Sequence, residues 1–151
     1  MEIVEFAGHH ALAFKALNEA WIGKHFTLEP KDREILEDPQ GQVIAKGGMI
    51  FMAFDDDRAV GCAALIAMAD GGYEVAKMTV VEGLRGAGLD RKLMQRCIAA
   101  GARAGAHRLY LETNSGLAPA LGLYRAMGFV DVPPPPHNDY ARADVWMARR
   151  Y

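Results

Sequence analysis

The sequence predicts a domain of the α/β (α+β) class, built on a mixed, mostly antiparallel central sheet. Three strand-like runs, Met49–Phe54, Ala59–Met68 and Tyr73–Val81, follow one another with only turn-forming residues between them, which is typical of an antiparallel meander. A segment of helical period from Leu89 and a strand at Leu109–Thr113 come next, and a strand–helix–strand unit normally makes its two strands parallel neighbours. The sheet is therefore expected to be mixed.

The residues before the meander predict one short strand and two helices. Ile3–Phe6 has the composition of a strand, and the helix after it is expected to carry an apolar stripe that includes Trp21. Pro30 suits the first turn of a second helix, which the Asp-Pro pair ending at Pro39 is expected to close. A loop rich in Gly, Gln and Lys is expected from there to Gly48.

The C-terminal half predicts two helices and further strands. The helix that begins at Leu89 is expected to end near Gly105. Ala120–Met127 has the apolar stripe of a further helix, which Gly128 can close in the left-handed conformation before the next strand. Pro133–Pro136 is a stiff connector, and it is expected to lead across a sheet edge because prolines donate no ladder hydrogen bonds. Ala143–Met147 is apolar enough for a closing strand.

The composition is that of one globular domain covering residues 1–151. Hydrophobic residues make up 51% and charged residues 24% of the chain, which provides enough apolar material for a core. Cys62 and Cys97 lie in apolar segments and form no CxxC or Cys/His pattern, which indicates buried free thiols in a reducing compartment. We therefore expect a cytoplasmic protein.

Nucleic acid, membrane and metal are not expected as partners. The formal net charge of −2 provides no general attraction to nucleic acid or anionic membranes. No apolar run approaches the ~20 residues that span a bilayer, and the first residues lack the basic flank and apolar run of a signal peptide. The histidines lack the short spacings of metal ligands and stand at His9, His10, His25, His107 and His137.

The segment from Lys77 to Met94 has the layout of an anion-binding site. An apolar strand enters a glycine-containing loop that opens a helix, and the unpaired N–H groups and dipole of a helix N-terminus attract phosphate. Gly86 and Gly88 let the backbone approach a ligand, and Arg85 adds a positive charge. The same glycines also fit simple loop punctuation. The GK[ST] of a P-loop and the last glycine of a Rossmann fingerprint are missing, so neither an NTPase nor a dinucleotide domain is expected.

Two motifs resemble those of the GNAT acetyltransferase superfamily and occur in the same order. Leu84–Leu93 is similar to its R-x-x-G-x-[GA] loop, and Leu123–Phe129, LYRAMGF, is similar to its LYxxxGF segment. The resemblance covers Met49 to Val132 best, and the segments that begin at Leu111 and Tyr140 resemble a bacterial branch with generic acetyltransferase labels. It implies a GNAT-like fold with helices on both faces of the sheet, and acetyltransferase activity with acetyl-CoA as co-substrate.

The resemblance also implies roles for residues of the donor site. The main chain of Met78, Thr79 and Val80 is expected to pair with the pantetheine arm and to polarise the acetyl carbonyl. Tyr124 corresponds to the tyrosine that protonates the departing thiolate, although its helical spacing alone also fits a buried aromatic. The pyrophosphate is expected on the loop formed by Arg85, Gly86, Ala87, Gly88, Leu89 and Asp90.

Two positions depart from the family pattern. Asp90 stands where Gly or Ala is usual, and Leu117 stands where many relatives have asparagine. We expect Asn114 to make the pantetheine contact of that asparagine. A carboxylate beside a pyrophosphate is repelled, so Asp90 is expected to point to solvent or toward Arg91, Lys92 or a neighbouring turn.

Glu74 is the first candidate for the base that an amine nucleophile needs. It precedes Met78 by four residues on one predicted strand, so strand alternation places both on the same face, together with Ala76 and Val80. A solvated carboxylate at the strand end is the alternative. Glu112, on the strand after the helix, is the reserve.

The acceptor is expected to lie between the first helices and the last loop. The expected acceptor contacts are Trp21, Glu112, Tyr140 and Arg142, with Phe26 and Asp32 in the same region. Core packing is the alternative role for the tryptophan, and a surface turn is the alternative for the tyrosine and the arginine.

The sequence therefore predicts an N-acetyltransferase that moves an acetyl group from acetyl-CoA to a primary amine by direct attack. The acceptor is a small amine, an amino acid or a peptide amine. A non-catalytic acyl-CoA-binding regulatory module is the main alternative, and an interaction protein that uses its proline run is a third. The resemblance is compatible with a homodimer.

Overall fold

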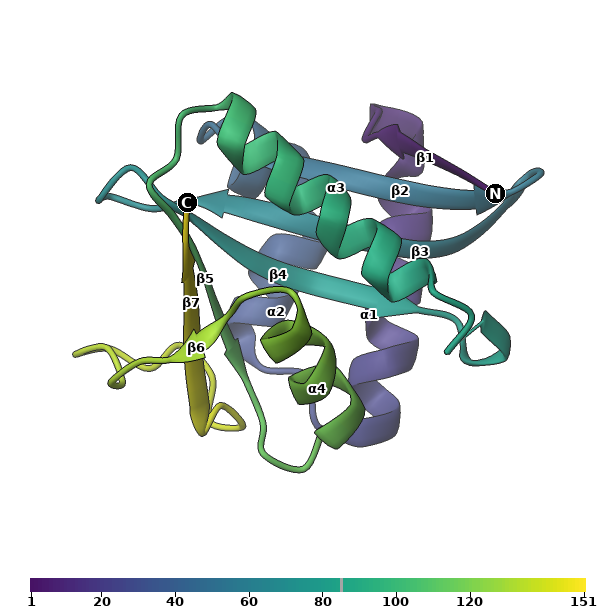
Figure 1. The fold of residues 1–151 in the computed structure, drawn as a ribbon. Coiled ribbons are helices and arrows are strands. Elements are labelled where there is room, and N and C mark those ends of the chain that lie inside the picture. The colour runs from purple at the N-terminus through teal and green to yellow at the C-terminus, as the bar shows by residue number, and fades with distance from the viewer. Residues whose placement is uncertain (85) are drawn as a thin grey trace.

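The computed structural model describes residues 1–84 and 86–151 and shows a seven-stranded sheet with helices on both faces (Figure 1). The strands are β1 (Glu2–Glu5), β2 (Met49–Asp55), β3 (Arg58–Ala67), β4 (Tyr73–Val80), β5 (Arg108–Thr113), β6 (Val130–Asp131) and β7 (Val145–Arg150). The helices are α1 (Ala11–His25), α2 (Pro30–Glu37), α3 (Leu89–Arg103) and α4 (Ala118–Ala126), with shorter turns η1 (Gly8–His10), η2 (Gln40–Ile44) and η3 (Glu82–Leu84).

The order of the strands across the sheet is β1-β2-β3-β4-β5-β7-β6. β4 and β5 pair in parallel, and the other neighbouring pairs of described strands are antiparallel. α3 connects these two parallel strands along the chain, as a strand–helix–strand unit requires. The predicted mixed, mostly antiparallel sheet is therefore confirmed.

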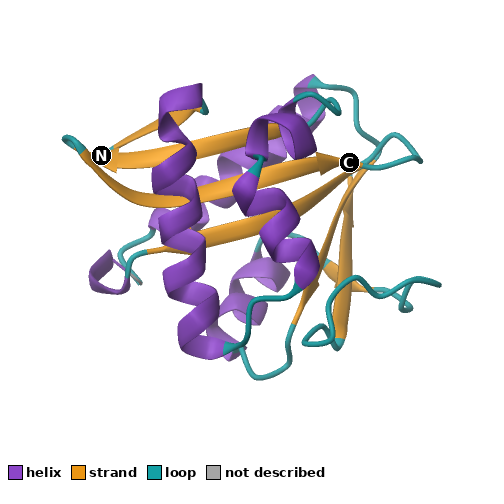
Figure 2. Ribbon diagram, turned by 180° about the vertical axis from the view of Figure 1, so that it is seen from behind, coloured by secondary structure: helices purple, strands orange, loops and turns teal. Residues whose placement is uncertain are grey.

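α3 and α4 lie on one face of the sheet and α1 and α2 on the other (Figures 1 and 2). A hydrophobic core fills the space on each face. The α3-side core joins the sheet to α3 and α4 and includes Phe51, Val60, Leu65, Val75, Val80, Leu89, Leu93, Met94, Leu109, Phe129 and Met147. The α1-side core joins it to α1 and α2 and includes Phe14, Ile22, Ile35, Leu36, Val43, Ile50 and Met52. Burial of both faces explains the largely apolar composition of the central strands.

Local signals start and stop the helices near the predicted residues. α2 begins with Pro30 in its first turn, and the Asp32 carboxylate accepts a hydrogen bond from the Glu29 N–H at 2.8 Å. α3 follows Gly88, whose φ of 90° is left-handed. α4 is closed by Gly128 with a φ of 96°, a conformation that favours glycine.

Two predicted boundaries are wrong. Gln40–Ile44, expected to be a loop, forms a π-helical turn, because the Asp38 carboxylate accepts a hydrogen bond from the Gly41 N–H at 3.0 Å and Val43 is buried in the α1-side core. The last strand begins at Val145 and not at Ala143, because the preceding residues belong to the loop that contacts α2.

Both cysteines are free and buried, as predicted. Burial raises the pKa of each thiol to about 12, so Cys62 and Cys97 remain protonated at neutral pH. Among the helices described, none combines the length and the apolar character of a membrane-spanning segment.

Candidate active site

A cleft opens where β4 and β5 separate. The two strands pair at Tyr73 with Leu109 and at Glu74 with Tyr110, and the described residues beyond this point form no further pairs between them (Figure 1). The pocket at this opening is lined by β4, β5, α1, α4, the first turn of α3 and the loop before β7. Its lining includes the predicted site residues Trp21, Glu74, Met78, Thr79, Val80, Asp90, Glu112, Asn114, Tyr124, Tyr140 and Arg142.

A bulge in β4 determines which side chains enter this cleft. Ala76 lies opposite Ala64 and Thr79 opposite Cys62, so β4 has one more residue than β3 between these two pairs. Lys77 lies in the bulge and has a φ of 53°, which is left-handed and uncommon for a lysine. The extra residue reverses the alternation of the strand.

The prediction that Glu74 shares a strand face with Met78 and Val80 is therefore wrong. Val75, Met78 and Val80 pack on the α3-side core, whereas Lys77 points to the opposite face and binds Asp32 of α2. Strand alternation holds only while each residue has one partner, and a bulge shifts all later side chains by one position. Glu74 still lines the cleft.

The loop before α3 presents backbone toward solvent. Gly86 and Gly88 have φ values of 79° and 90°, and no atom lies within 4 Å of where a Cβ would stand on either residue. Leu89, the first residue of α3, packs in the α3-side core and is buried as a whole residue. Arg85, predicted to bind phosphate, lies outside the described residues.

Asp90 turns its carboxylate onto the helix that it begins. Its Oδ1 accepts a hydrogen bond from the Arg91 N–H at 2.9 Å, one of the orientations expected from the sequence. A carboxylate in the first turn interacts favourably with the helix dipole. The same carboxylate occupies one N–H group that a bound anion can otherwise use.

Glu74 and Glu112 bring two carboxylates to the point where the strands part. Burial and the nearby charge of Glu112 raise the pKa of Glu74 to about 7. Burial likewise raises the pKa of Glu112, whose Oε2 accepts a hydrogen bond from the Tyr110 hydroxyl at 2.8 Å. The Oε1 of Glu112 is buried and has no hydrogen-bond partner among the described residues. A group with a pKa near 7 exchanges protons readily at neutral pH.

Tyr124 lines the same cleft from α4. Its ring lies 6.2 Å from that of Phe129, and its side chain is half-buried between the α3-side core and the cleft. Leu117 also lines the cleft, whereas the Asn114 side chain is engaged with the chain itself. Asn114 donates to the Arg142 carbonyl at 2.7 Å and accepts from the Gly116 N–H at 2.8 Å, so its predicted contact with pantetheine stays a prediction.

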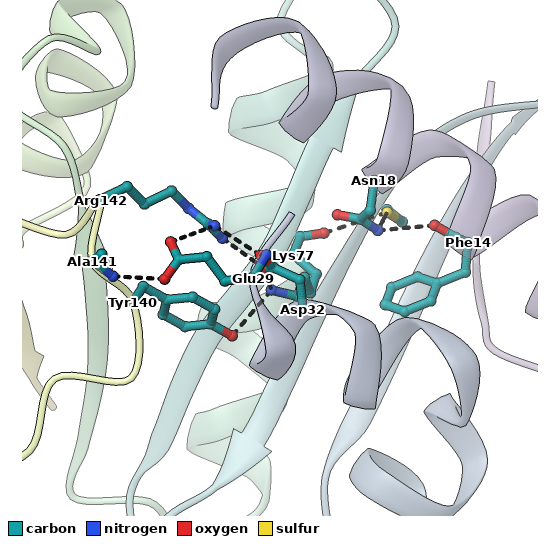
Figure 3. Close-up of polar contacts among 9 residues, drawn as sticks. Phe14, Asn18, Glu29, Asp32, Lys77, Tyr140, Ala141 and Arg142 are labelled. Atoms are coloured by element: carbon teal, nitrogen blue, oxygen red, sulfur yellow. Dashed lines mark hydrogen bonds and ion pairs between the residues drawn. The ribbon is translucent and has the colours of Figure 1, made fainter. Parts of the chain in front are cut away.

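A buried ion cluster closes the side of the cleft near α2 (Figure 3). Arg142 donates two hydrogen bonds to the Asp32 carboxylate at 2.7 and 2.8 Å, and Lys77 donates to it at 2.6 Å. Lys77 also donates to the Tyr140 hydroxyl at 3.1 Å. Burial alone raises the pKa of Asp32, but hydrogen bonds from Arg142 and the charge of Lys77 outweigh it and lower the pKa to about 2.

Sequence reasoning named Asp32, Tyr140 and Arg142 as candidates near the acceptor but predicted no contact among them, and it missed Lys77 and Glu29. The Ala141 N–H donates to the Glu29 Oε1 at 2.7 Å, and Arg142 contacts the Oε2 of the same glutamate at 3.2 Å. A lysine in the middle of a mostly apolar strand was the available signal for Lys77, because a buried cation requires a partner. Among residues 1–84 and 86–151, no three His, Cys, Asp or Glu side chains are arranged to hold a metal ion.

Comparisons with known proteins agree with this geometry. The model of the acetyltransferase (GNAT) family matches residues 13–129. A protein called IAA acetyltransferase from Azospirillum brasilense is 37% identical over 92 residues, which are 60% of this chain and 60% of that protein's length. The chain therefore covers less than two thirds of the length of that relative.

Two solved structures share the fold at low sequence identity. An acetyltransferase of the GNAT family from Staphylococcus aureus superposes with a TM-score of 0.89 at 18% identity, covering 99% of this chain and 98% of that one. A putative acetyltransferase from Salmonella typhimurium with its cofactor acetyl-CoA superposes with a TM-score of 0.77 at 20% identity, covering 99% and 93%. These two structures show that the chain shares their fold. The family match over residues 13–129 shows that the chain belongs to the acetyltransferase (GNAT) family.

Proposed function

We propose that this protein transfers an acetyl group from acetyl-CoA to a primary amine by direct attack. The acceptor is a small amine, an amino acid or a peptide amine. The observation that carries the proposal is the opening between β4 and β5, which has the N-terminus of α3 at one end and two carboxylates at the other. Aminolysis of a thioester needs an extended slot for the donor, a base and a proton source, and this cleft holds residues suited to each task.

The residues of the cleft fit acetyl-CoA in two respects. The edge of β4 that faces β5 has no partner strand beyond Glu74 among the described residues, so its N–H and C=O groups are placed to bind an extended chain of amides. The loop of Gly86, Ala87 and Gly88 exposes backbone at a helix N-terminus, which suits a pyrophosphate. The thioester supplies the activated acetyl group.

Glu74 acts in this proposal as the base. Amines are ammonium ions at neutral pH, and an amine attacks only after it loses a proton. The pKa of about 7 lets Glu74 take that proton directly or through water, whereas a fully solvated glutamate is too weak a base. In this proposal, a backbone N–H from the segment Met78–Val80, which lines the cleft, stabilises the developing oxyanion.

Tyr124 acts as the acid that returns a proton to the leaving thiolate. The residue lines the cleft from α4, together with residues of β4. A thiolate is a better leaving group when it is protonated as it departs, and a tyrosine hydroxyl is a suitable donor. No covalent intermediate on the protein is required.

The charges near Glu74 favour a cationic acceptor over an anionic one. Among the described residues, the two lysine or arginine side chains that line the cleft, Lys77 and Arg142, already bind Asp32. Glu74 and Glu112 form no ion pair with a described lysine or arginine, and the charges of Lys77 and Lys31 offset only part of the rise in the pKa of Glu74. An incoming ammonium group relieves the repulsion between these two carboxylates.

Two measurements test the proposed function. Acetyl-CoA is expected to raise the melting temperature, because a ligand that binds only the folded state stabilises it by mass action, whereas CoA fragments without the pantetheine arm have a smaller effect. A panel of amines with acetyl-CoA is then assayed for thiol release and acetylated product. Stabilisation without transfer to any amine supports a non-catalytic acyl-CoA-binding module instead, and no stabilisation at all overturns the proposal.

The proposal treats residues 1–151 as one acetyl-CoA-dependent domain that works in the cytoplasm. The family permits a homodimer, which sedimentation of the purified chain tests directly. Neither point is needed for the chemistry, since the residues assigned to base, acid and donor site come from a single chain.

A further inference from the structure

Asp32 is a fully buried carboxylate that receives hydrogen bonds from three separate segments. Its side chain is 0% exposed and accepts from the Glu29 N–H, from Lys77 and twice from Arg142. These donors come from the start of α2, the middle of β4 and the loop before β7 (Figure 3). One side chain therefore connects elements that line both sides of the cleft.

On the donor side, Asp32 holds the bulge of β4. The Lys77 side chain is 4% exposed, and its ammonium lies 2.6 Å from the Oδ1 of Asp32. The bulge is also held through its backbone, because the Cys62 thiol donates to the Lys77 carbonyl at 3.4 Å. The left-handed backbone of Lys77 is unfavourable by itself, so these contacts are needed to maintain it. The bulge in turn directs Met78 to Val80 along the cleft.

On the acceptor side, Asp32 holds the loop Tyr140–Arg142. Arg142 meets the carboxylate with both of its terminal nitrogens, a fixed two-point geometry that a lysine cannot reproduce. The Tyr140 ring lies beneath the Arg142 guanidinium at 4.5 Å and the Lys77 ammonium at 4.7 Å. Tyr140 and Arg142 both line the cleft, so the position of this loop sets the shape of the acceptor side.

We propose that Asp32 is a positioning residue that fixes the loop Tyr140–Arg142 to the β4 bulge. The acceptor amine is thereby held in register with the acetyl group of the donor, that is, aligned for attack. Buried ion pairs lose much of their Coulomb energy to desolvation, so an apolar cluster can stabilise a fold equally well. What the ion cluster provides is a defined geometry between two walls of the cleft. The inference rests on the proposed function, because register matters only if two substrates react there.

Three variants separate the two halves of this role. Lys77→Met removes the donor-side link, and we expect it to weaken acetyl-CoA binding about tenfold as the bulge relaxes. Arg142→Lys keeps the charge but loses the two-point contact, and we expect the KM of the acceptor to rise about tenfold with acetyl-CoA affinity within about twofold of wild type. Asp32→Asn is expected to show both effects.

The matched control is Asp70→Asn, which removes a carboxylate from an ion pair with Arg108 that does not line the cleft. Its acetyl-CoA affinity and acceptor KM are expected to stay at the wild-type values. All measurements are made well below each variant's melting temperature. If Asp32→Asn is too unstable to purify, Lys77→Met and Arg142→Lys decide the matter by their separate effects.

The proposal is overturned if the cleft variants lower the melting temperature but leave acetyl-CoA affinity and acceptor KM at the control values, since the cluster is then merely structural. If the wild type binds acetyl-CoA but acetylates no amine, the proposed function fails. Calorimetry then tests the donor-side half of the role alone: a weaker acetyl-CoA affinity in Lys77→Met and Asp32→Asn supports a role of Asp32 in holding the β4 bulge for the donor, and an unchanged affinity rejects that role too.

Discussion

Glu74 on β4 lies opposite Tyr110 on β5, and this is the last described residue pair before the two strands separate. The Tyr110 hydroxyl donates to Glu112, whose charge is one cause of the raised pKa of Glu74, after burial. The two carboxylates therefore meet at the apex of the cleft. A buried carboxylate with a pKa near 7 at this position can both attract an ammonium ion and accept its proton.

The acidic limb of the pH–rate profile is expected to follow the ionisation of the Glu74 carboxyl group. The wild-type kcat/KM rises as pH increases through about 7, because the carboxylate must lose its proton before it can act as the base. Glu74→Gln is expected to lower the rate by about 10²-fold and to remove this dependence. Glu112→Gln serves as the comparison: it removes a like charge, so the limb moves to lower pH. A wild-type profile in Glu74→Gln assigns the base to Glu112 or to water.

Tyr124→Phe is expected to lower kcat by about 10²-fold or more while acetyl-CoA affinity stays within about twofold. The ring that packs near Phe129 is retained, whereas the proton source for the leaving thiolate is lost. Single-turnover assays and calorimetry measure the two quantities. Tyr151→Phe is the control, because this hydroxyl donates to the Ile98 carbonyl away from the cleft. Unchanged turnover in Tyr124→Phe leaves this tyrosine with a packing role.

Asp90→Ala is expected to bind acetyl-CoA about two- to fivefold more tightly at low salt and to be slightly less stable without ligand. The substitution removes a negative charge near the pyrophosphate and frees the Arg91 N–H that the carboxylate now occupies. The gain in affinity shrinks at high salt, because screening weakens the repulsion. Asp90→Asn removes the charge but keeps an acceptor for the N–H, so it separates the two effects. Tenfold weaker binding in Asp90→Ala means that the carboxylate organises the loop.

Asp32 is expected to make the protein sensitive to acid. Its pKa is about 2 in the folded state against an ordinary value of 3.8, so its ionised form stabilises the fold above pH 3.8 and this contribution is lost as pH falls toward 2. The shift corresponds to roughly 2 kcal/mol of unfolding free energy. Denaturant titrations between pH 5 and about 2 measure it. The stability difference between wild type and Asp32→Asn narrows over this range, and a constant difference contradicts the assignment.

The sequence alone determined the elements and the family resemblance. Periodicity and turn chemistry act over a few residues, so they located the meander, α3, α4 and the parallel β4–β5 pair to within a few positions. The two motifs predicted the order of β4, α3, β5 and α4 along the chain, because each motif lies at a fixed point of a strand–helix–strand–helix unit. Cys62 and Cys97 were assigned to the core for the same local reason.

The tertiary structure decided the arrangement of the cleft. The bulge in β4 has no period of its own, so alternation placed Glu74 on the face of Met78, and Lys77 was overlooked. Arg142 and Asp32 are 110 residues apart, and no local pattern encodes such a pair. Contacts of this kind depend on how the packed sheet and helices bring distant segments together, and only the complete fold determines which buried charge finds which partner.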